Sequence, residues 1–166
     1  MVKWLRNSTS GMWVMTIVRL YLGYQWLMDG FEKVSGGFSA KGFVANAIAH
    51  PVVGPTGSQS FPGYTPFLKS FVMPNINLFS FVVSWGELLV GLGLLLGTLT
   101  TAAAFFGVVM NFCYLMAGTV SVNPTYVLLG FLIMIAGFNA GKIGLDRWVV
   151  PFLREKMPWL KRSVEK

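Results

Sequence analysis

The fold of this chain is decided by residues 88–141, LLVGLGLLLGTLTTAAAFFGVVMNFCYLMAGTVSVNPTYVLLGFLIMIAGFNAG. These 54 residues contain no Asp, Glu, Lys or Arg. One membrane-spanning helix needs about 20 predominantly apolar residues, so this stretch is long enough to cross a bilayer more than once. We therefore predict an all-α integral membrane protein.

The composition of the whole chain agrees with this prediction. Its 166 residues are 54% hydrophobic and 11% charged, whereas a soluble domain usually carries about 25% charged residues. The alternative is a soluble protein with an apolar core helix, but such helices are usually shorter and flanked by charged amphipathic ones. The length suits one compact domain, residues 1–166.

Turn-forming residues and charges divide the chain into four expected spans. The first apolar run carries Arg19 in its middle and is followed by no convincing small-residue cleavage site, so we expect it to stay in the protein rather than act as a signal peptide. Asn123 is expected to cap the fourth helix, with Pro124 in its first position. The four-helix transmembrane bundle is predicted to have its spans at 12–30, 76–96, 99–117 and 124–141.

A long connecting segment, 36–75, separates the first two spans. Its five prolines, at positions 51, 55, 62, 66 and 74, are expected to break helices. The pieces 39–49 and 64–72 remain rich in apolar residues, and we predict that each forms a short amphipathic helix at the membrane interface. Together they would make a lid over the mouth of the bundle.

Basic residues set the expected topology. The net charge is +7 and the pI about 9.8, a balance that in a soluble protein would suggest nucleic acid. Here the basic residues lie beside the spans, so nucleic-acid binding is not needed to explain the positive charge. Both termini are predicted to be cytoplasmic, and segment 36–75 extracytoplasmic. The basic tail, 142–166, contains Lys142, Arg147, Arg154, Lys156, Lys161, Arg162 and Lys166.

Two ionisable residues are expected inside the bilayer. The centres of the first two spans place Arg19 and Glu87 at similar depth, and an unpaired charge there costs about 3 kcal/mol, so we predict that they pair. Ser80, Ser84 and Glu87 recur at helical spacing and share one polar face of the second span. Asn111 lies on a similar face of the third span, among small residues.

Six residues form the predicted ligand site, with Glu87 also the candidate catalytic residue because it can exchange a proton. The alternative is that Arg19, Glu87 and Asn111 only fix the packing of the helices. Either tryptophan of the set, taken singly, is better explained as an aromatic-belt or core residue. The six residues are Arg19, Trp26, Asp29, Trp85, Glu87 and Asn111.

Several chemistries are excluded by what the sequence lacks. Cys113 is the only cysteine, so no intrachain disulfide or redox pair is possible. His50 is the only histidine, so paired histidines cannot hold a haem in the bundle. No cluster has metal-ligand spacing, and we expect no covalently bound or metal cofactor. Any redox molecule would have to diffuse in.

Four stretches of this chain resemble the DoxX family, and within it the branch related to DoxD, the membrane subunit of thiosulfate:quinone oxidoreductase. They are RLYLGYQWLMDGFEKVSGGFSAKGF (19–43), WGELLVGLGLLLGTLT (85–100), MAGTVSVNP (116–124) and GFNAGKIGLDRWVVP (137–151).

The resemblance implies a four-helix protein of a prokaryotic inner membrane that contacts the quinone pool and a partner oxidoreductase subunit. By this resemblance, the positions that correspond to recurrent residues of the family are Arg19, Glu87, Asn139, Gly141, Gly144 and Asp146.

Three functions remain open at this stage. The first is a quinone-interacting subunit of a membrane oxidoreductase, with a diffusible quinone as its ligand. The second is a non-catalytic scaffold or assembly partner of another enzyme. A small-solute transporter has less support, because four helices leave little room for a pore unless the chain forms a homo-oligomer.

Overall fold

The computed structural model describes residues 1–157, and the regular secondary structure in that range is helical, with no strand. The predicted fold class, all-α, is confirmed. The α-helices are α1 (Val2–Asn7), α2 (Thr9–Ser35), α3 (Lys41–Ala49), α4 (Tyr64–Phe67), α5 (Ile76–Leu96), α6 (Thr100–Met116), α7 (Asn123–Ala136), α8 (Phe138–Gly141) and α9 (Asp146–Lys156). The predicted tail residues Lys161, Arg162 and Lys166 lie outside the described range.

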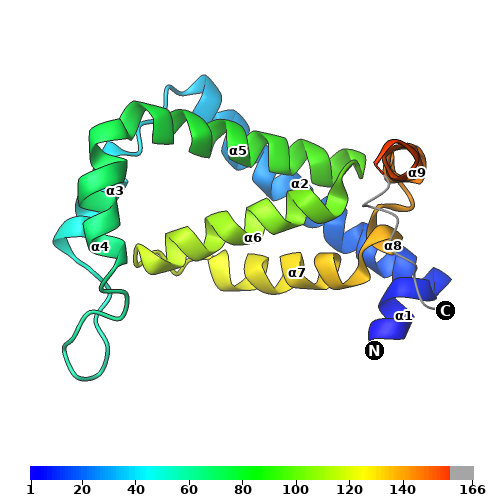
Figure 1. The fold of residues 1–166 in the computed structure, drawn as a ribbon, viewed down its shortest axis with the longest axis horizontal. Coiled ribbons are helices and arrows are strands. Elements are labelled where there is room, and N and C mark those ends of the chain that lie inside the picture. The colour runs from blue at the N-terminus through cyan, green and yellow to red at the C-terminus, as the bar shows by residue number, and fades with distance from the viewer. Residues whose placement is uncertain (158–166) are drawn as a thin grey trace.

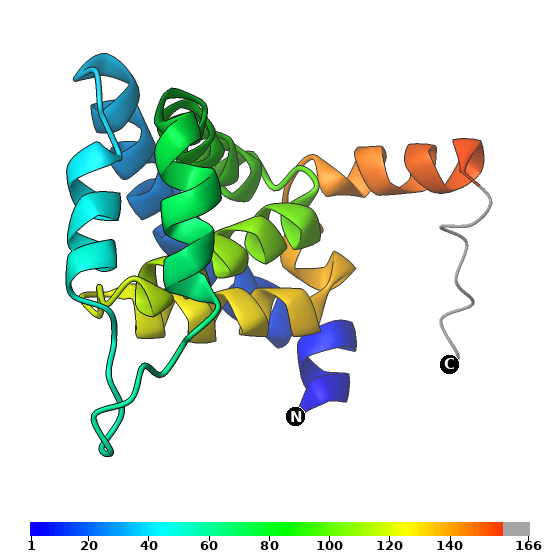
Figure 2. The ribbon, with the colours of Figure 1, turned by 60° about the vertical axis from the view of Figure 1, so that its left-hand side comes forward.

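Four long helices, α2, α5, α6 and α7, form the body of the molecule (Figure 1). The short helices α3 and α4 lie across one end of this bundle, which we call the lid end. At the other end, the base, lie α1, α8 and α9, and the N-terminus is there too. Figure 2 shows that α9 projects sideways from the base instead of continuing along the bundle.

Local sequence explains where the long helices begin and end. The Ser8 hydroxyl accepts a hydrogen bond from the backbone N–H of Gly11 at 2.9 Å and so caps the start of α2. At the end of α5, Gly97 adopts the left-handed conformation, φ 62°, that glycine tolerates best. The predicted second span, 76–96, coincides with α5.

The fourth predicted helix differs from the expectation at both ends. Asn123 does not cap it, because its side chain donates backwards to the Thr119 carbonyl oxygen at 2.8 Å, and Val122 occupies the capping position. The helix stops at Ala136, five residues early, because Gly137 takes φ 59° and ψ −130°. The short helix α8 continues to Gly141 after this break.

The lid contains both predicted short helices. The first, 39–49, corresponds to α3, and the second, 64–72, corresponds to α4 together with the π-helix Leu68–Val72 that follows it. The expectation that Pro66 and Pro74 break the chain's helical path is wrong. Pro66 lies in the first turn of α4, where no backbone N–H is needed, and Pro74 lies in a 3₁₀ turn, Met73–Asn75. The helical path therefore runs without a loop from Tyr64 to Leu96.

Glycines allow α2 and α5 to pack backbone against backbone. A Cβ atom added to Gly91 would collide with the backbone of Leu27, and one added to Gly30 would collide with the backbone of Leu88. At Gly23 it would lie 2.9 Å from the Leu94 Cβ. These contacts set a single antiparallel register for the two helices, since any shift would bring larger side chains into the same space.

The outer surfaces of the four long helices are apolar. Exposed side chains include Trp13, Ile17 and Tyr24 on α2 and Phe81 and Leu89 on α5. The other two helices add Phe105, Phe106, Phe112, Leu128 and Phe131. By length and composition, one described helical stretch, Tyr64–Leu96, is apolar enough to cross a membrane, while α6 and α7 are shorter apolar helices.

The glycine contact predicts a selective loss of stability. Gly91→Ala should destabilise the protein by about 2 kcal/mol or more, because the new methyl group meets backbone that cannot rotate away. Gly42→Ala in α3 is the matched control, since nothing lies within 4 Å of its Cβ position. Thermal unfolding in mild detergent measures both variants, and equal melting temperatures would contradict the close packing.

Candidate functional site

A cavity of about 440 Å³ lies between the lid and the adjoining ends of the four long helices. This volume is within the usual range for small-molecule sites, about 300–1,000 Å³. Apolar and aromatic side chains from both the lid and the bundle form most of its wall. The aromatic residues include Trp26, Phe38, Phe43, Tyr64, Tyr114 and Tyr126.

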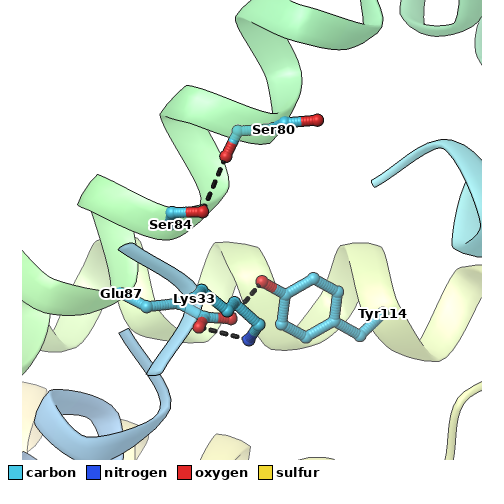
Figure 3. Close-up of polar contacts among 5 residues, drawn as sticks. All are labelled: Lys33, Ser80, Ser84, Glu87 and Tyr114. Atoms are coloured by element: carbon cyan, nitrogen blue, oxygen red, sulfur yellow. Dashed lines mark hydrogen bonds and ion pairs between the residues drawn. The ribbon is translucent and has the colours of Figure 1, made fainter. Parts of the chain in front are cut away.

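A buried carboxylate, that of Glu87 on α5, lies at the cavity wall with 1% of the residue exposed. Lys33 from α2 forms an ion pair with it. The Tyr114 hydroxyl from α6 donates a hydrogen bond to Glu87 Oε1 at 2.6 Å. Figure 3 shows the three side chains converging from three different helices. The buried charge is tolerated because it has both a counter-charge and a hydrogen-bond donor.

The polar face of α5 also ties the lid to the bundle. Ser84 donates to the Ser80 carbonyl oxygen at 2.9 Å, one turn away along α5 (Figure 3). The Ser80 hydroxyl accepts a hydrogen bond from the backbone N–H of Ala40, at the start of α3, at 3.0 Å. The predicted common face of Ser80, Ser84 and Glu87 is therefore confirmed, since all three are buried.

The lid end of α2 brings further charge to the cavity. Asp29 and Lys33 both line it, and Asp29 is an exposed residue. Asp29 and Lys33 also border a smaller, more polar depression with Glu32. Lys33, with 27% of its side chain exposed, thus lies between external water and the buried Glu87 carboxylate.

The predicted pair of Arg19 and Glu87 is wrong. The Arg19 guanidinium lies at the base and donates hydrogen bonds to backbone carbonyl oxygens of Leu94, of Leu95 at 3.0 Å and of Ile143 at 2.8 Å. It thereby satisfies carbonyl groups at the C-terminus of α5, where a positive charge also complements the helix dipole.

The register of α2 and α5 explains this correction. Gly91 faces Leu27 and Gly30 faces Leu88, so Glu87 lies opposite residue 31 or its neighbours. Arg19 is 12 residues earlier in α2 than residue 31, a separation of about 18 Å at 1.5 Å per residue. The two span centres predicted from the sequence do not lie side by side.

The segment 139–146 also closes the base. The Asp146 carboxylate accepts hydrogen bonds from the backbone N–H groups of Leu99, at 2.6 Å, and Thr100, at 3.0 Å, and so caps the start of α6. Asn139 donates to the Leu5 carbonyl oxygen at 2.7 Å. Gly144 packs against Gly97, where a side chain would not fit. These residues hold helix ends together.

Of the six predicted site residues, four line the cavity and two do not. Trp26, Asp29, Glu87 and Asn111 line the cavity together. Trp85 does not line it, because it lies on the outer surface of α5, 42% exposed, beside Phe81. Four of the six predicted residues therefore meet at one site, and Arg19 and Trp85 do not belong to it.

Sequence reasoning missed the partners of Glu87. Tyr114 follows Asn111 by three residues, and that spacing places both on one face of α6, but it does not show that Tyr114 meets Glu87. Lys33 shares a face of α2 with Trp26 and Gly30, yet only the register shows that it meets Glu87. The lid residues Phe43 and Tyr64 had no pattern that could have linked them to the bundle.

Among residues 1–157 no group of three or more His, Cys, Asp and Glu side chains is placed to hold a metal ion. Cys113, the free cysteine, lies beside the cavity, and the Tyr64 hydroxyl donates to its backbone carbonyl oxygen at 2.9 Å. The ionisable side chains among the described lining residues are Asp29, Lys33, Glu87, the Cys113 thiol and the tyrosines.

Comparison with known proteins identifies the family. The family model for DoxX matches residues 14–120, from the first turns of α2 to the turn after α6. The chain belongs to the DoxX family. This family is membrane-associated. No curated protein and no solved structure matches the chain. The matched range includes Lys33, Glu87 and Tyr114, whereas segment 139–146 lies beyond it.

The ion pair at the cavity predicts that substitutions of Lys33 and Glu87 have non-additive effects on the stability of the protein. Lys33→Met should destabilise the protein by about 1–3 kcal/mol, because the Glu87 carboxylate stays buried without its counter-charge. Adding Glu87→Gln should recover most of this loss, since the charge that needed a partner is then absent. Lys41→Met, at an exposed position of α3, is the control and should have little effect. Additive losses in the double variant would contradict the pairing.

Proposed function

We propose that this DoxX-family protein spans the membrane four times, through α2, α5, α6 and the combined α7 and α8. The support is the apolar outer surface of all four helices. On α2, every exposed side chain from Trp13 to Met28 is apolar or a tyrosine, while Arg19 points inwards and is 2% exposed. Lipid is the solvent that suits such a surface.

The two ends of the bundle differ in charge, which supports cytoplasmic termini. The base carries Lys3, Arg6, Lys142, Arg147 and Lys156. Basic residues beside spans favour the cytoplasmic side. Helix α9 exposes Trp148 and Phe152 between its basic residues, a composition suited to lying in the membrane–water interface of a prokaryotic inner membrane.

This topology predicts a labelling pattern. In a Cys113→Ser background, a membrane-impermeant maleimide should label Thr56→Cys, in the loop before α4, on intact bacterial cells. Lys3→Cys and Glu155→Cys should be labelled only after the membrane is permeabilised, because both lie at the base. Labelling of Glu155→Cys on intact cells would contradict the orientation.

We further propose that the cavity binds a quinone and that the protein is a quinone-interacting subunit of a membrane oxidoreductase. The observation that carries this is an aromatic cavity, about 440 Å³, with a paired, ionisable carboxylate in its wall. A flat apolar ring with polar oxygen atoms complements it. Phe67 and Val82 line the cavity and are also 44% and 51% exposed at the surface, which suits lateral access from lipid.

Glu87 is the candidate catalytic residue in this proposal. Reduction of a quinone to its quinol consumes two electrons and two protons. Glu87 takes each proton in turn from external water by way of Lys33, passes it to a ring oxygen and returns to the ionised form that pairs with Lys33. The electrons come from a donor or partner subunit at the lid end. The resemblance to the DoxD-like branch suggests thiosulfate as the first donor to screen.

The alternative, a scaffold without catalytic function, has support from one observation. Arg19, Asn139 and Asp146 bond to backbone groups and act as structural ties at the base. A scaffold, however, has no need of an aromatic cavity with a buried carboxylate, so we favour the quinone site.

Filling the cavity should test this proposal. Val44→Trp adds an indole from the lid side, because Val44 is buried and lines the cavity. Purified wild-type protein should retain close to one quinone per chain by mass spectrometry of extracted lipid, and Val44→Trp should lose it. Val109→Trp adds the same bulk at an outward position of α6, 41% exposed, and should retain quinone. Quinone no richer than in bulk membrane lipid in every sample would refute the proposal.

A further inference from the structure

Two side chains in the cavity wall carry buried polar atoms without partners. Asn111 is 1% exposed and Trp26 is 3% exposed. Within residues 1–157, neither the Trp26 indole Nε1 nor the Asn111 Oδ1 and Nδ2 atoms make a hydrogen bond. Buried polar atoms in native proteins are nearly always paired, so these three atoms point to a ligand that supplies what the chain lacks.

The unpartnered atoms define what such a ligand must offer. The Trp26 indole N–H can only donate a hydrogen bond. The Asn111 amide donates through its NH₂ group and accepts through its oxygen, whichever way the amide is turned. The set therefore comprises two donor groups and one acceptor. A ligand that satisfies all three must both accept and donate hydrogen bonds.

The Glu87 carboxylate is a second group that can accept a hydrogen bond from a donor on the ligand. It already accepts from Lys33 and from Tyr114, but an ionised carboxylate has about four acceptor positions and no proton to donate. Two acceptors in the cavity wall can therefore accept further hydrogen bonds: the Asn111 amide oxygen and the Glu87 carboxylate. A ligand without an O–H or N–H group leaves both without a further donor.

The two redox forms of a quinone differ in this respect. The ring oxygens of the oxidised form only accept hydrogen bonds, so they can pair with Trp26 and the Asn111 NH₂ group but leave the amide oxygen unpaired. The reduced form carries two hydroxyl groups, each of which donates and accepts. Leaving one buried acceptor unpaired is unfavourable, and one hydrogen bond is enough to discriminate between such ligands.

We infer that the cavity binds the hydroquinone form of its ligand in preference to the quinone form, and that Asn111 makes the distinction. The inference rests on the proposed quinone site and adds the redox state that the site selects. Tighter binding of the reduced form raises the reduction potential of the bound couple. The site therefore favours electron transfer towards its quinone and holds the quinol that results.

The test compares the two forms directly. Purified protein depleted of endogenous quinone is titrated, without oxygen, by calorimetry with a short-chain benzoquinone and separately with its dithionite-reduced quinol. We expect the quinol to bind roughly tenfold more tightly, from one additional satisfied acceptor. In Asn111→Leu, which keeps the side-chain size, this ratio should fall towards one, chiefly through weaker quinol binding.

Two further variants separate the roles. Trp26→Phe removes a donor that both forms can satisfy, so it should weaken both and leave their ratio unchanged. Asn77→Leu makes the same chemical change at an exposed position of α5 outside the cavity and should alter neither affinity.

The outcomes are distinguishable. Equal affinities of the wild-type protein for the two forms would overturn the inferred preference and leave the quinone site intact. Binding of neither form would overturn the proposed function itself. A preference that persists in Asn111→Leu would overturn the role of Asn111.

Discussion

The close approach of α2 and α5 is the constraint on which the rest of this structure depends. Gly23, Gly30 and Gly91 remove the side chains that would hold the two backbones apart. Once the helices meet there, their register is set, and the positions of the polar residues on both helices follow. Lys33 faces Glu87 at the lid end, and Arg19 reaches the carbonyl groups that end α5 at the base. A bundle without these glycines could slide by a turn, and neither arrangement would be specified.

The polar groups inside this DoxX-family protein fall into two sets with different physical character. At the base, the guanidinium of Arg19, the carboxylate of Asp146 and the amide of Asn139 bond to backbone groups at helix ends. These are groups that every helix leaves unpaired, so the base acts as a closure. At the lid end the side chains pair with one another around a cavity. Buried side-chain atoms without a hydrogen-bond partner occur at both ends: Arg19 Nε and Thr100 Oγ1 at the base, and atoms of Trp26 and Asn111 in the cavity wall. The polar residues that bond to helix ends and those that surround the cavity are thus separated along the length of the same helices.

The lid shows how a segment that looks like a linker contributes to the site. Residues 36–75 read as a turn-rich connection, yet α3 and the helical stretch before α5 carry buried apolar residues that form a second, small core, including Val44, Leu68 and Val72. The hydrogen bond from Ala40 to Ser80 joins this core to the bundle. The cavity therefore has one wall from the lid and one from the long helices, and it exists only where they meet.

The sequence by itself determined the fold class, the start and end of α5, the short lid helices and the buried polar face of that helix. These features depend on composition and on the 3.6-residue period, which are local properties. The period also predicted that Asn111 lies on an inward face. Only the tertiary structure decided that Glu87 meets Lys33 and Tyr114, that Arg19 serves the base, and that Trp26 lines the cavity while Trp85 faces outwards. The physical reason is that helical periodicity says which residues share a face, whereas the contacts between helices depend on their register, and here glycines distant in sequence set that register.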